Sequence, residues 1–365
     1  MPSSIRARRD AGNRIAGVGS IPVQQALYHR QGDDPPRRLA RSTDFVDDWC
    51  DLAETIIAGF GTRAGGLGCP LVVFALPLTA KTTAVVRVVD RAGSGSGSGL
   101  AFHFLVMDHQ AYERYAGDPF VVAQRLPSDW DARGDLPALS WPSEPLPPRT
   151  VADVQKVLRR VKASALREDE DPEAPDFERT VENSESPALL GGVQILVDGG
   201  KLVFARPKGD LALVESLWTL LPYSTRGKLW PASFAFNNDL GFDVVVLPRV
   251  SEAGLEGYTT EDQAALYPQG SYELALQTAA EAGDQRELET VFRRRNSSEM
   301  LRLAVWLLAG MMLLVIGSRW FMPPPSGPTV HQQKAAAAAG IVAVGDPWTA
   351  AVMLEHGKRL WSSEQ

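Results

Sequence analysis

The sequence predicts an α+β protein: two mixed α/β cytoplasmic units with largely antiparallel sheets, followed by a single transmembrane helix. Three observations support this prediction. β-Branched runs with short connections predict antiparallel strands, flanking segments carry apolar stripes at helical spacing, and one long uncharged segment lies near the C-terminus. The 365 residues allow two ordinary domains, and 44% apolar with 22% charged residues is typical of a globular chain.

The overall charge and the cysteine usage narrow the classes of function. A formal net charge of −7 provides no global attraction to nucleic acid or to anionic lipid. The two cysteines, Cys50 and Cys69, form no disulfide framework, and we interpret them as free, partly buried thiols in a reducing compartment. No nucleic-acid partner is therefore predicted.

The first unit is predicted as β-rich. The runs "PLVVFALPL", "TTAVVRVVDR" and "LAFHFLVMD" read as three strands, and the connection "TAKTT" favours antiparallel neighbours. A helix is predicted in "STDFVDDWCDLAETIIAGFG", with Ser42 or Asp44 as its N-cap and Gly59 or Gly61 at its end. A second helix is predicted in "RTVADVQKVLRRVKASAL", whose valines and leucine share one stripe.

The second unit is predicted as a smaller α/β unit. "VQILVDGGKLVFARP" reads as a hairpin with Gly199 and Gly200 in the turn. "DLALVESLWTLLP" reads as a helix capped by Asp210, "ASFAFN" and "FDVVVLP" read as strands, and the later helical segment is predicted to break at Gly283. In "LPYSTRGKLWPASFAFNND" we expect core aromatic residues, with Arg226 and Lys228 on a loop.

The uncharged run from Leu303 to Gly317 predicts a membrane-spanning helix, since about 20 helical residues cross the hydrocarbon layer. Trp306 and Trp320 near its two ends and the prolines that follow agree with this prediction. Arginines concentrate on its N-terminal side, which predicts a cytoplasmic body on the inner face of the plasma membrane and a short tail outside.

These patterns predict seven segments. They are a disordered basic arm at 1–20, a β-rich α+β domain at 21–165, an acidic linker at 166–186, a second α/β unit at 187–280, a juxtamembrane helix at 281–302, the transmembrane helix at 303–322 and an extracytoplasmic tail at 323–365. Whether residues 21–280 form one domain or two is left open.

No motif identifies a reaction. The glycine-rich run Gly59–Gly68 precedes a strand, and Lys81-Thr82-Thr83 lacks the glycine of a phosphate loop, so both are interpreted as turns. The histidines form no metal-ligand pattern. We therefore nominate no catalytic, cofactor-binding or metal-ligating residue and expect no cofactor. His103, Asp108 and His109 are the candidates if the chain is an enzyme.

Several segments resemble bacterial GTPase-associated proteins over about residues 21–250. They are "QQALYHRQGDDPPRRLARSTDF", "LAFHFLVMDHQAYERYAGDPFVVAQRLP" with its Asp-Pro, and "LVESLWTLLPYSTRGKLWPASFAF", in which a helix, "LLP", an arginine and a Ser-Phe strand follow one another. The resemblance implies a non-catalytic component that works beside a GTPase. The family's long C-terminal region is absent here, and Arg38 stands where the family has a leucine.

The expected function is that of a membrane-anchored cytoplasmic adaptor or scaffold. Its expected partners are membrane lipids, through residues 303–322, and a protein, such as a GTPase or a conflict-system effector. A surface-bound adaptor raises the effective concentration of its partner. The alternatives are a structural component of a membrane-associated assembly, for which the C-terminal tail should matter, or a tethered hydrolase of unknown substrate; an enzyme is the less favoured reading.

Overall fold

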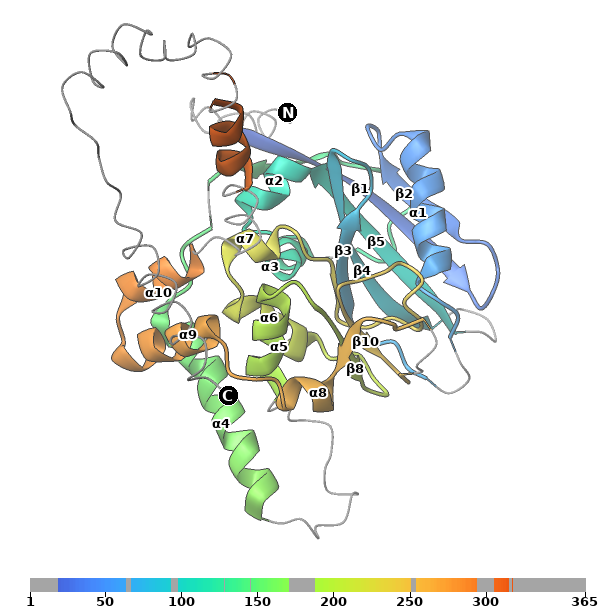
Figure 1. The fold of residues 1–365 in the computed structure, drawn as a ribbon. Coiled ribbons are helices and arrows are strands. Elements are labelled where there is room, and N and C mark those ends of the chain that lie inside the picture. Colours follow the sequence, from blue (N-terminus) through green and yellow to red (C-terminus); the bar gives the residue numbers. More distant parts are fainter. Residues whose placement is uncertain are drawn as a thin grey trace, which may run out of the picture. The chain divides into compact units, whose positions relative to one another are not determined.

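The computed structural model describes residues 19–63, 67–92, 98–127, 129–144, 146–170, 188–250, 254–293, 305–314 and 317. The chain divides into one compact unit over Met1–Glu299 and a second unit over Met300–Gln365. The compact unit is built on a mixed sheet of eleven strands in the order β11-β8-β10-β9-β3-β4-β5-β1-β2-β6, with β7 paired to β1 beside that path (Figure 1).

The first half of the sheet is antiparallel. β3 pairs with β4, β4 with β5, β5 with β1 and β1 with β2 in antiparallel register, which confirms the pairing predicted from the three apolar runs. Only the edge pair β2–β6 is parallel here. The strands are β1 Ser20–Gln31, β2 Arg37–Ser42, β3 Val72–Pro77, β4 Thr82–Ala92, β5 Ser98–Asp108, β6 Gly134–Leu136 and β7 Leu139–Pro142.

The second half of the sheet is parallel, which corrects the prediction of largely antiparallel sheets in both units. β10 pairs in parallel with β8 and β9, and β8 pairs in parallel with β11. Parallel neighbours need crossover connections, and α6 and α7 lie on the connection from β8 to β9. The strands are β8 Lys201–Ala205, β9 Pro231–Ala232, β10 Val244–Leu247 and β11 Tyr258–Thr260.

The two halves share one sheet and one core. β3 pairs with β9 through Phe74 and Ala232, so the predicted units 21–165 and 187–280 are joined by backbone hydrogen bonds. The ring of Phe60 lies 5.6 Å from the rings of both Phe74 and Phe236, which carries aromatic packing across the junction. Residues 21–280 therefore contain a single continuous core.

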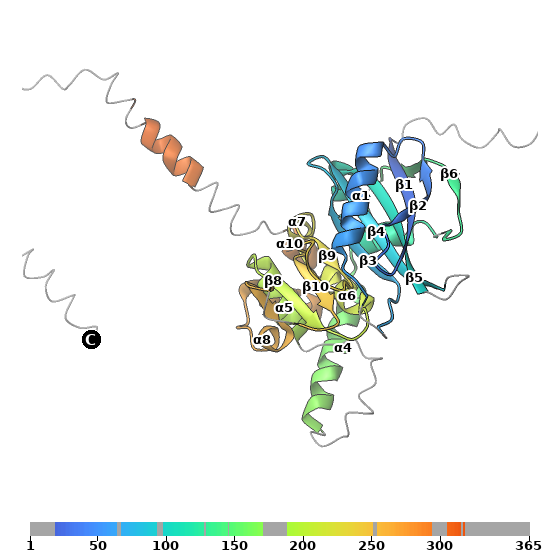
Figure 2. The same ribbon diagram turned by 90° about the vertical axis from the view of Figure 1, so that its right-hand side faces the viewer.

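Helices cover both faces of the antiparallel half, with α1 on one side and α2, α3 and α6 on the other (Figures 1 and 2). In the second half, α5 contacts β8 and the helices α6, α8 and α9. The helices are α1 Asp47–Gly59, α2 His109–Arg114, α3 Pro119–Gln124, α4 Val151–Glu170, α5 Ala188–Val197, α6 Leu211–Leu220, α7 Tyr223–Arg226, α8 Glu261–Ala265, α9 Ser271–Ala282 and α10 Gln285–Phe292.

Some helices begin and end at the capping residues that the sequence predicted, and others do not. Asp210 accepts from the backbone N–H of Leu213 at the start of α6, and Gly283 ends α9 in the left-handed conformation, so both predictions are confirmed. Neither Ser42 nor Asp44 caps α1, which begins after Val46 without a side-chain cap and has Asp47 and Asp48 in its first turn. α1 ends at Gly59, as predicted.

The predicted hairpin at 193–207 is wrong. Its first arm is the helix α5, and Gly199, at φ +91°, lies in the turn that leads from this helix into β8. α5 is buried nearly all round. A short apolar run that is buried on all sides has no polar stripe, so its spacing does not separate a helix from a strand.

The structure contradicts the expected transmembrane helix. Within the described residues, no helix is both long enough and apolar enough to cross a membrane. Near the expected span, the described helical residues are 305–314 and 317. A stretch of 305–314 rises only about 15 Å, whereas the hydrocarbon layer is about 30 Å thick. The predicted helix at 303–322 is therefore longer than the helical stretch that the structure describes there.

Other predicted segments fall partly or wholly outside the described residues. α4 continues to Glu170, into the predicted acidic linker, and the rest of that linker lies outside them. Of the predicted juxtamembrane helix, α10 covers Gln285–Phe292. The basic arm, apart from residues 19 and 20, and the whole tail at 323–365 also lie outside the described residues.

Candidate functional site

The three candidates from the sequence do not form one site. His103 lies on β5, is buried, and contacts Arg87 and Gln25. His109 begins α2 and contacts the hydroxyl of Thr83, while Asp108 caps α2 by accepting from the N–H of Gln110. Among the residues that the structure describes, no group of three or more histidine, cysteine, aspartate or glutamate side chains could hold a metal ion.

The other motifs are explained by local structure. Lys81 lies in the turn between β3 and β4, where its N–H donates to the hydroxyl of Thr79 and its carbonyl accepts from the N–H of His109. Both cysteines are free and buried, as expected. Burial raises the pKa of the Cys69 thiol to about 12, so this thiol stays protonated at neutral pH.

A pocket of about 990 Å³ lies where four separate parts of the chain meet. Its walls are the α2–α3 turn, the segment 146–149, α7 with the residues that follow it, and one face of α10. Five cationic side chains and three acidic ones line it: Arg114, Arg149, Arg226, Lys228, Arg293, Glu113, Asp118 and Glu289. We call this site the arginine pocket.

The α2–α3 turn is held in a strained conformation at the edge of the arginine pocket. Ala116 has φ 56°, in the left-handed region that costs a non-glycine residue about 1 kcal/mol or more. Gly117 follows at φ 59°, and a Cβ atom there would lie 2.7 Å from the backbone nitrogen of Gly227. The hydroxyl of Tyr112 and the indole of Trp218 both donate to the carbonyl of Gly117. Strain held in place at a pocket edge is a common feature of binding sites.

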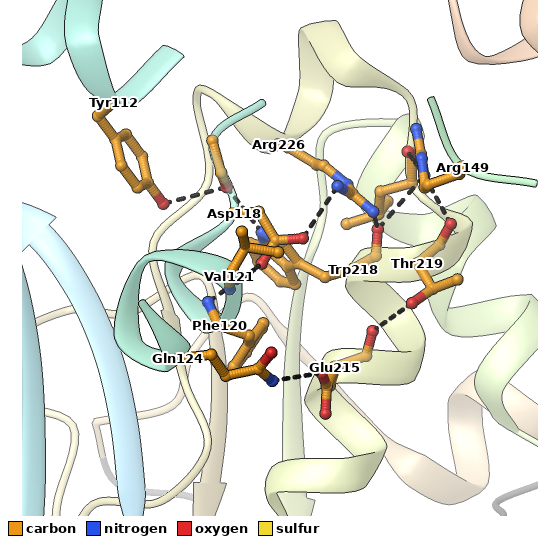
Figure 3. A network of polar contacts seen from close by, with 12 residues as sticks. Tyr112, Asp118, Phe120, Val121, Gln124, Arg149, Glu215, Trp218, Thr219 and Arg226 are labelled. Carbon is orange, nitrogen blue, oxygen red and sulfur yellow. Dashed lines mark hydrogen bonds and ion pairs between the residues drawn. The ribbon is translucent and has the colours of Figure 1, made fainter. Parts of the chain in front are cut away.

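This turn places Asp118 between a helix start and an arginine. One carboxylate oxygen of Asp118 accepts from the backbone N–H groups of Phe120 and Val121, which caps α3. The other oxygen lies 3.1 Å from a guanidinium nitrogen of Arg226. Figure 3 shows the aspartate between the two. Asp118 therefore fixes the position of Arg226 relative to α3.

Arg226 is not on a solvated loop, contrary to the sequence interpretation. Its side chain is only 3% exposed, and burial lowers the pKa of its guanidinium, an effect that the charge of Asp118 opposes. A second guanidinium nitrogen donates to the carbonyl of Trp218 near the end of α6. Lys228, in contrast, is exposed as predicted.

Arg149 meets Arg226 at the end of α6 (Figure 3). One of its nitrogens donates to the carbonyls of Thr219 at 2.6 Å and Leu221 at 2.7 Å. Its guanidinium carbon lies 3.5 Å from the ring centroid of Phe292 and 4.5 Å from that of Tyr223, so the group stacks on both rings. Burial, and next the charge of Arg226, lower the pKa of Arg149 to about 9.

The end of α6 explains why two arginines are buried here. The last turn of a helix leaves carbonyls without partners and carries partial negative charge. α6 has no basic residue in its last turn, and extended backbone at Leu221, followed by Pro222, ends it. Arg226 and Arg149 supply donors to these carbonyls, and the hydroxyl of Tyr272 donates to the carbonyl of Leu220. A buried helix that ends in "LLP" without a glycine is the sequence signal that predicts such donors.

The net charge of the arginine pocket is positive. Arg226 pairs with Asp118, and Arg293 pairs with Glu289 across one helical turn. Arg149 donates to backbone carbonyls, hydrogen-bonds the side chain of Tyr223 and stacks on two rings, and its Nε and Nη2 atoms are buried without an acceptor among the described residues. Arg114 donates to the hydroxyl of Ser143 and is exposed at the rim. The cations of the lining therefore outnumber its carboxylates, and the pocket attracts a negatively charged ligand.

Two of the segments on which the family resemblance depends meet in this site. The "DP" block supplies Asp118 and Pro119, and the "LLP" segment supplies Arg226 four residues after Pro222. No protein-family model matches the sequence, and a comparison with curated proteins finds no match. The expected relationship to GTPase-associated proteins therefore stays a prediction.

Proposed function

We propose that this chain is an adaptor that binds an acidic segment of a protein partner in the arginine pocket. A GTPase or a conflict-system effector is the class of partner that the sequence resemblance suggests. The observation on which the proposal depends is the excess of cationic groups around one pocket, where Arg149 has no carboxylate partner among the described residues.

The form of the pocket supports a peptide as the ligand. Its volume of about 990 Å³ is at the upper end of the range for small-molecule sites, which leaves room for several residues of an extended chain. Pro147 and Pro148 and the ring of Tyr223 supply an apolar wall beside the cations. Apolar surface and fixed positive charge together suit a segment that alternates acidic and apolar side chains.

The buried and exposed cations have different roles in this proposal. Arg149 and Arg226 are held by carbonyls and rings, so they contribute a fixed positive field and do not need to move. Arg114 and Lys228 are exposed at the rim, where they are placed to contact carboxylates of the partner directly. The rim cations should therefore set the rate and salt dependence of association.

The test uses the full chain and a fluorescein-labelled peptide of alternating glutamate and leucine. Arg114→Glu with Lys228→Glu should weaken binding by about tenfold or more, as expected for the loss of two rim ion pairs and the repulsion that replaces them. The matched control is Lys156→Glu with Arg159→Glu on α4, since both residues are exposed and lie away from the arginine pocket. The same peptide with glutamine in place of glutamate should bind weakly to every variant.

Salt provides a second measurement. Raising the salt from about 0.05 M to about 0.5 M should weaken peptide binding to the wild-type chain, because exposed charges are screened over about 4 Å at the higher concentration. Equal affinity of the wild-type chain and the rim variant for the glutamate peptide would contradict the proposal, provided that both variants unfold at similar urea concentrations.

A further inference from the structure

A second pocket, of about 360 Å³, lies on another side of α3 and is separate from the arginine pocket. α3 borders both pockets, since Val121 lines the first and Phe120 and Ala123 line the second. Its walls are mostly apolar and include Leu211 and the indole of Trp130. The charged side chain in this lining is Arg87 of β4.

Arg87 is buried, and its partners in the described part of the chain are neutral. It is 5% exposed, and one nitrogen donates to the backbone carbonyls of Ala123 and Leu126 at the end of α3. A second nitrogen contacts Nδ1 of His103 at 2.8 Å, and Nε has no acceptor. Burial lowers the pKa of Arg87 to about 10, so the guanidinium remains charged at neutral pH.

His103 does not act as a counter-charge for Arg87. Burial, and next the charge of Arg87, lower the pKa of His103 to about 3, so its ring is neutral at neutral pH. Because the guanidinium has only donors, Nδ1 of His103 is the acceptor of this hydrogen bond. The proton is then on Nε2, which donates to the side-chain oxygen of Gln25 at 3.1 Å. The network therefore leaves one full positive charge beside an apolar pocket.

We infer that this second pocket binds a small organic acid, with its carboxylate at Arg87 and its apolar body against Trp130, Phe120 and Leu211. A buried charge without a counter-ion is costly, and a carboxylate compensates for it. Arg87 lines this pocket, so its guanidinium supplies the cation that pairs with such a carboxylate. The volume is near the lower limit for ligand sites, which favours an acid the size of an aryl-acetate or a short fatty acid. This inference does not depend on the proposed adaptor function.

The test is calorimetric titration of the full chain with phenylacetate and hexanoate. Both acids should bind saturably, while phenylacetamide, which has nearly the same shape without the charge, should bind at least about tenfold more weakly. Acetate should also bind weakly, because it lacks the apolar body. Absence of saturable binding of both acids up to about 10 mM would overturn the inference.

Two variants test separately whether ligand binding depends on the charge of Arg87 and on the volume of the second pocket. Arg87→Met should weaken phenylacetate binding by about tenfold or more, whereas Arg159→Met, on the exposed face of α4 and outside this lining, should leave it unchanged. Ala123→Phe fills the pocket without changing Arg87, so it should also abolish binding even if Arg87→Met fails to fold. Wild-type affinity in a folded Ala123→Phe variant would overturn the inference.

Discussion

Arginines are buried both in the antiparallel half and at the junction of the two halves, around the end of α6, but their partners differ. In the antiparallel half, Arg30 donates to the carbonyls of Ile57 and Gly61 at the end of α1, and Arg87 donates to carbonyls at the end of α3. At the junction, the carbonyls at the end of α6 accept from Arg149 and Arg226. Asp118 also pairs with Arg226, and Arg149 stacks on two aromatic rings.

The common element is the carboxyl end of a helix. Its free carbonyls and its partial negative charge replace a carboxylate as the partner of a buried guanidinium. The two regions differ in that the junction adds the carboxylate of Asp118 as a partner of a buried guanidinium. Arg226 has Asp118, so removing one member of the pair should be costly, whereas the buried Arg87 of the antiparallel half contacts backbone carbonyls and the neutral ring of His103. The predictions below test this difference, beginning with the largest expected effect.

Asp118→Ala should lower the free energy of unfolding by about 3–5 kcal/mol. It leaves the charge of Arg226 buried without its partner and removes the cap of α3. Urea denaturation measures the change. The control is Arg226→Met alone and together with Asp118→Ala, because the double variant should lose less than the sum of the two single variants. Simple additivity would mean that the ion pair does not couple the two residues.

Lowering the pH should test the neutral network of the antiparallel half. The pKa of His103 is about 3 in the folded state and about 6.5 in the unfolded chain, so below pH 6.5 the unfolded state binds a proton that the folded state does not. Stability should therefore fall as the pH drops from 6.5, by about 3 kcal/mol at pH 4.

Urea denaturation at several pH values measures this loss. His103→Gln keeps an amide oxygen for Arg87 but does not titrate, so its stability should depend less on pH over the same window. His109→Gln, which changes the half-exposed histidine of α2, is the matched control. A His103→Gln variant with the same pH dependence as the wild type would show that His103 is not the group that titrates.

Arg149→Met should cost about 2–3 kcal/mol of unfolding free energy. The change leaves the carbonyls of Thr219 and Leu221 without donors but retains an apolar side chain against Phe292. Arg149→Lys should not restore full stability, since one ammonium group cannot both stack on the rings and reach both carbonyls. Arg114→Ala, at the exposed rim, should change stability by less than about 0.5 kcal/mol.

The smallest expected effect concerns the strained turn. Ala116→Gly should stabilise the fold by about 0.5–1 kcal/mol, because glycine adopts φ 56° without steric cost. Gly117→Ala is the paired variant and should destabilise the fold, since the new Cβ would lie 2.7 Å from the backbone of Gly227. Thermal unfolding of both variants measures the changes. A loss of stability in Ala116→Gly would show that the strain is not stored at this residue.

Local patterns in the sequence predicted much of the antiparallel half. The β-branched runs of β3, β4 and β5 and their antiparallel order follow from composition and short connections. The cap at Asp210 and the break at Gly283 also depend on neighbouring residues alone. The expected transmembrane helix was also a local interpretation, and it was wrong, because the described residues contain no helix long and apolar enough to cross a membrane.

The candidate site could not be predicted in the same way. Asp118, Arg149 and Arg226 are far apart in the sequence; Arg149 begins a segment predicted as a helix, and Arg226 was expected on a loop. The helix α5 was misread for a related reason, since its burial on all sides depends on contacts with α6, α8 and α9. The one usable signal was a buried helix that ends at "LLP" without a donor of its own.

The sequence by itself predicted β3, β4 and β5 of the antiparallel half, the helix ends at Asp210, Gly59 and Gly283, and the free state of the two cysteines. These depend on side-chain chemistry and backbone preference within a few residues. Only the tertiary structure decided that both halves share one sheet and that two arginines converge on the end of α6. A buried charge is stable only where partners from other segments surround it, and no local pattern records where those segments meet.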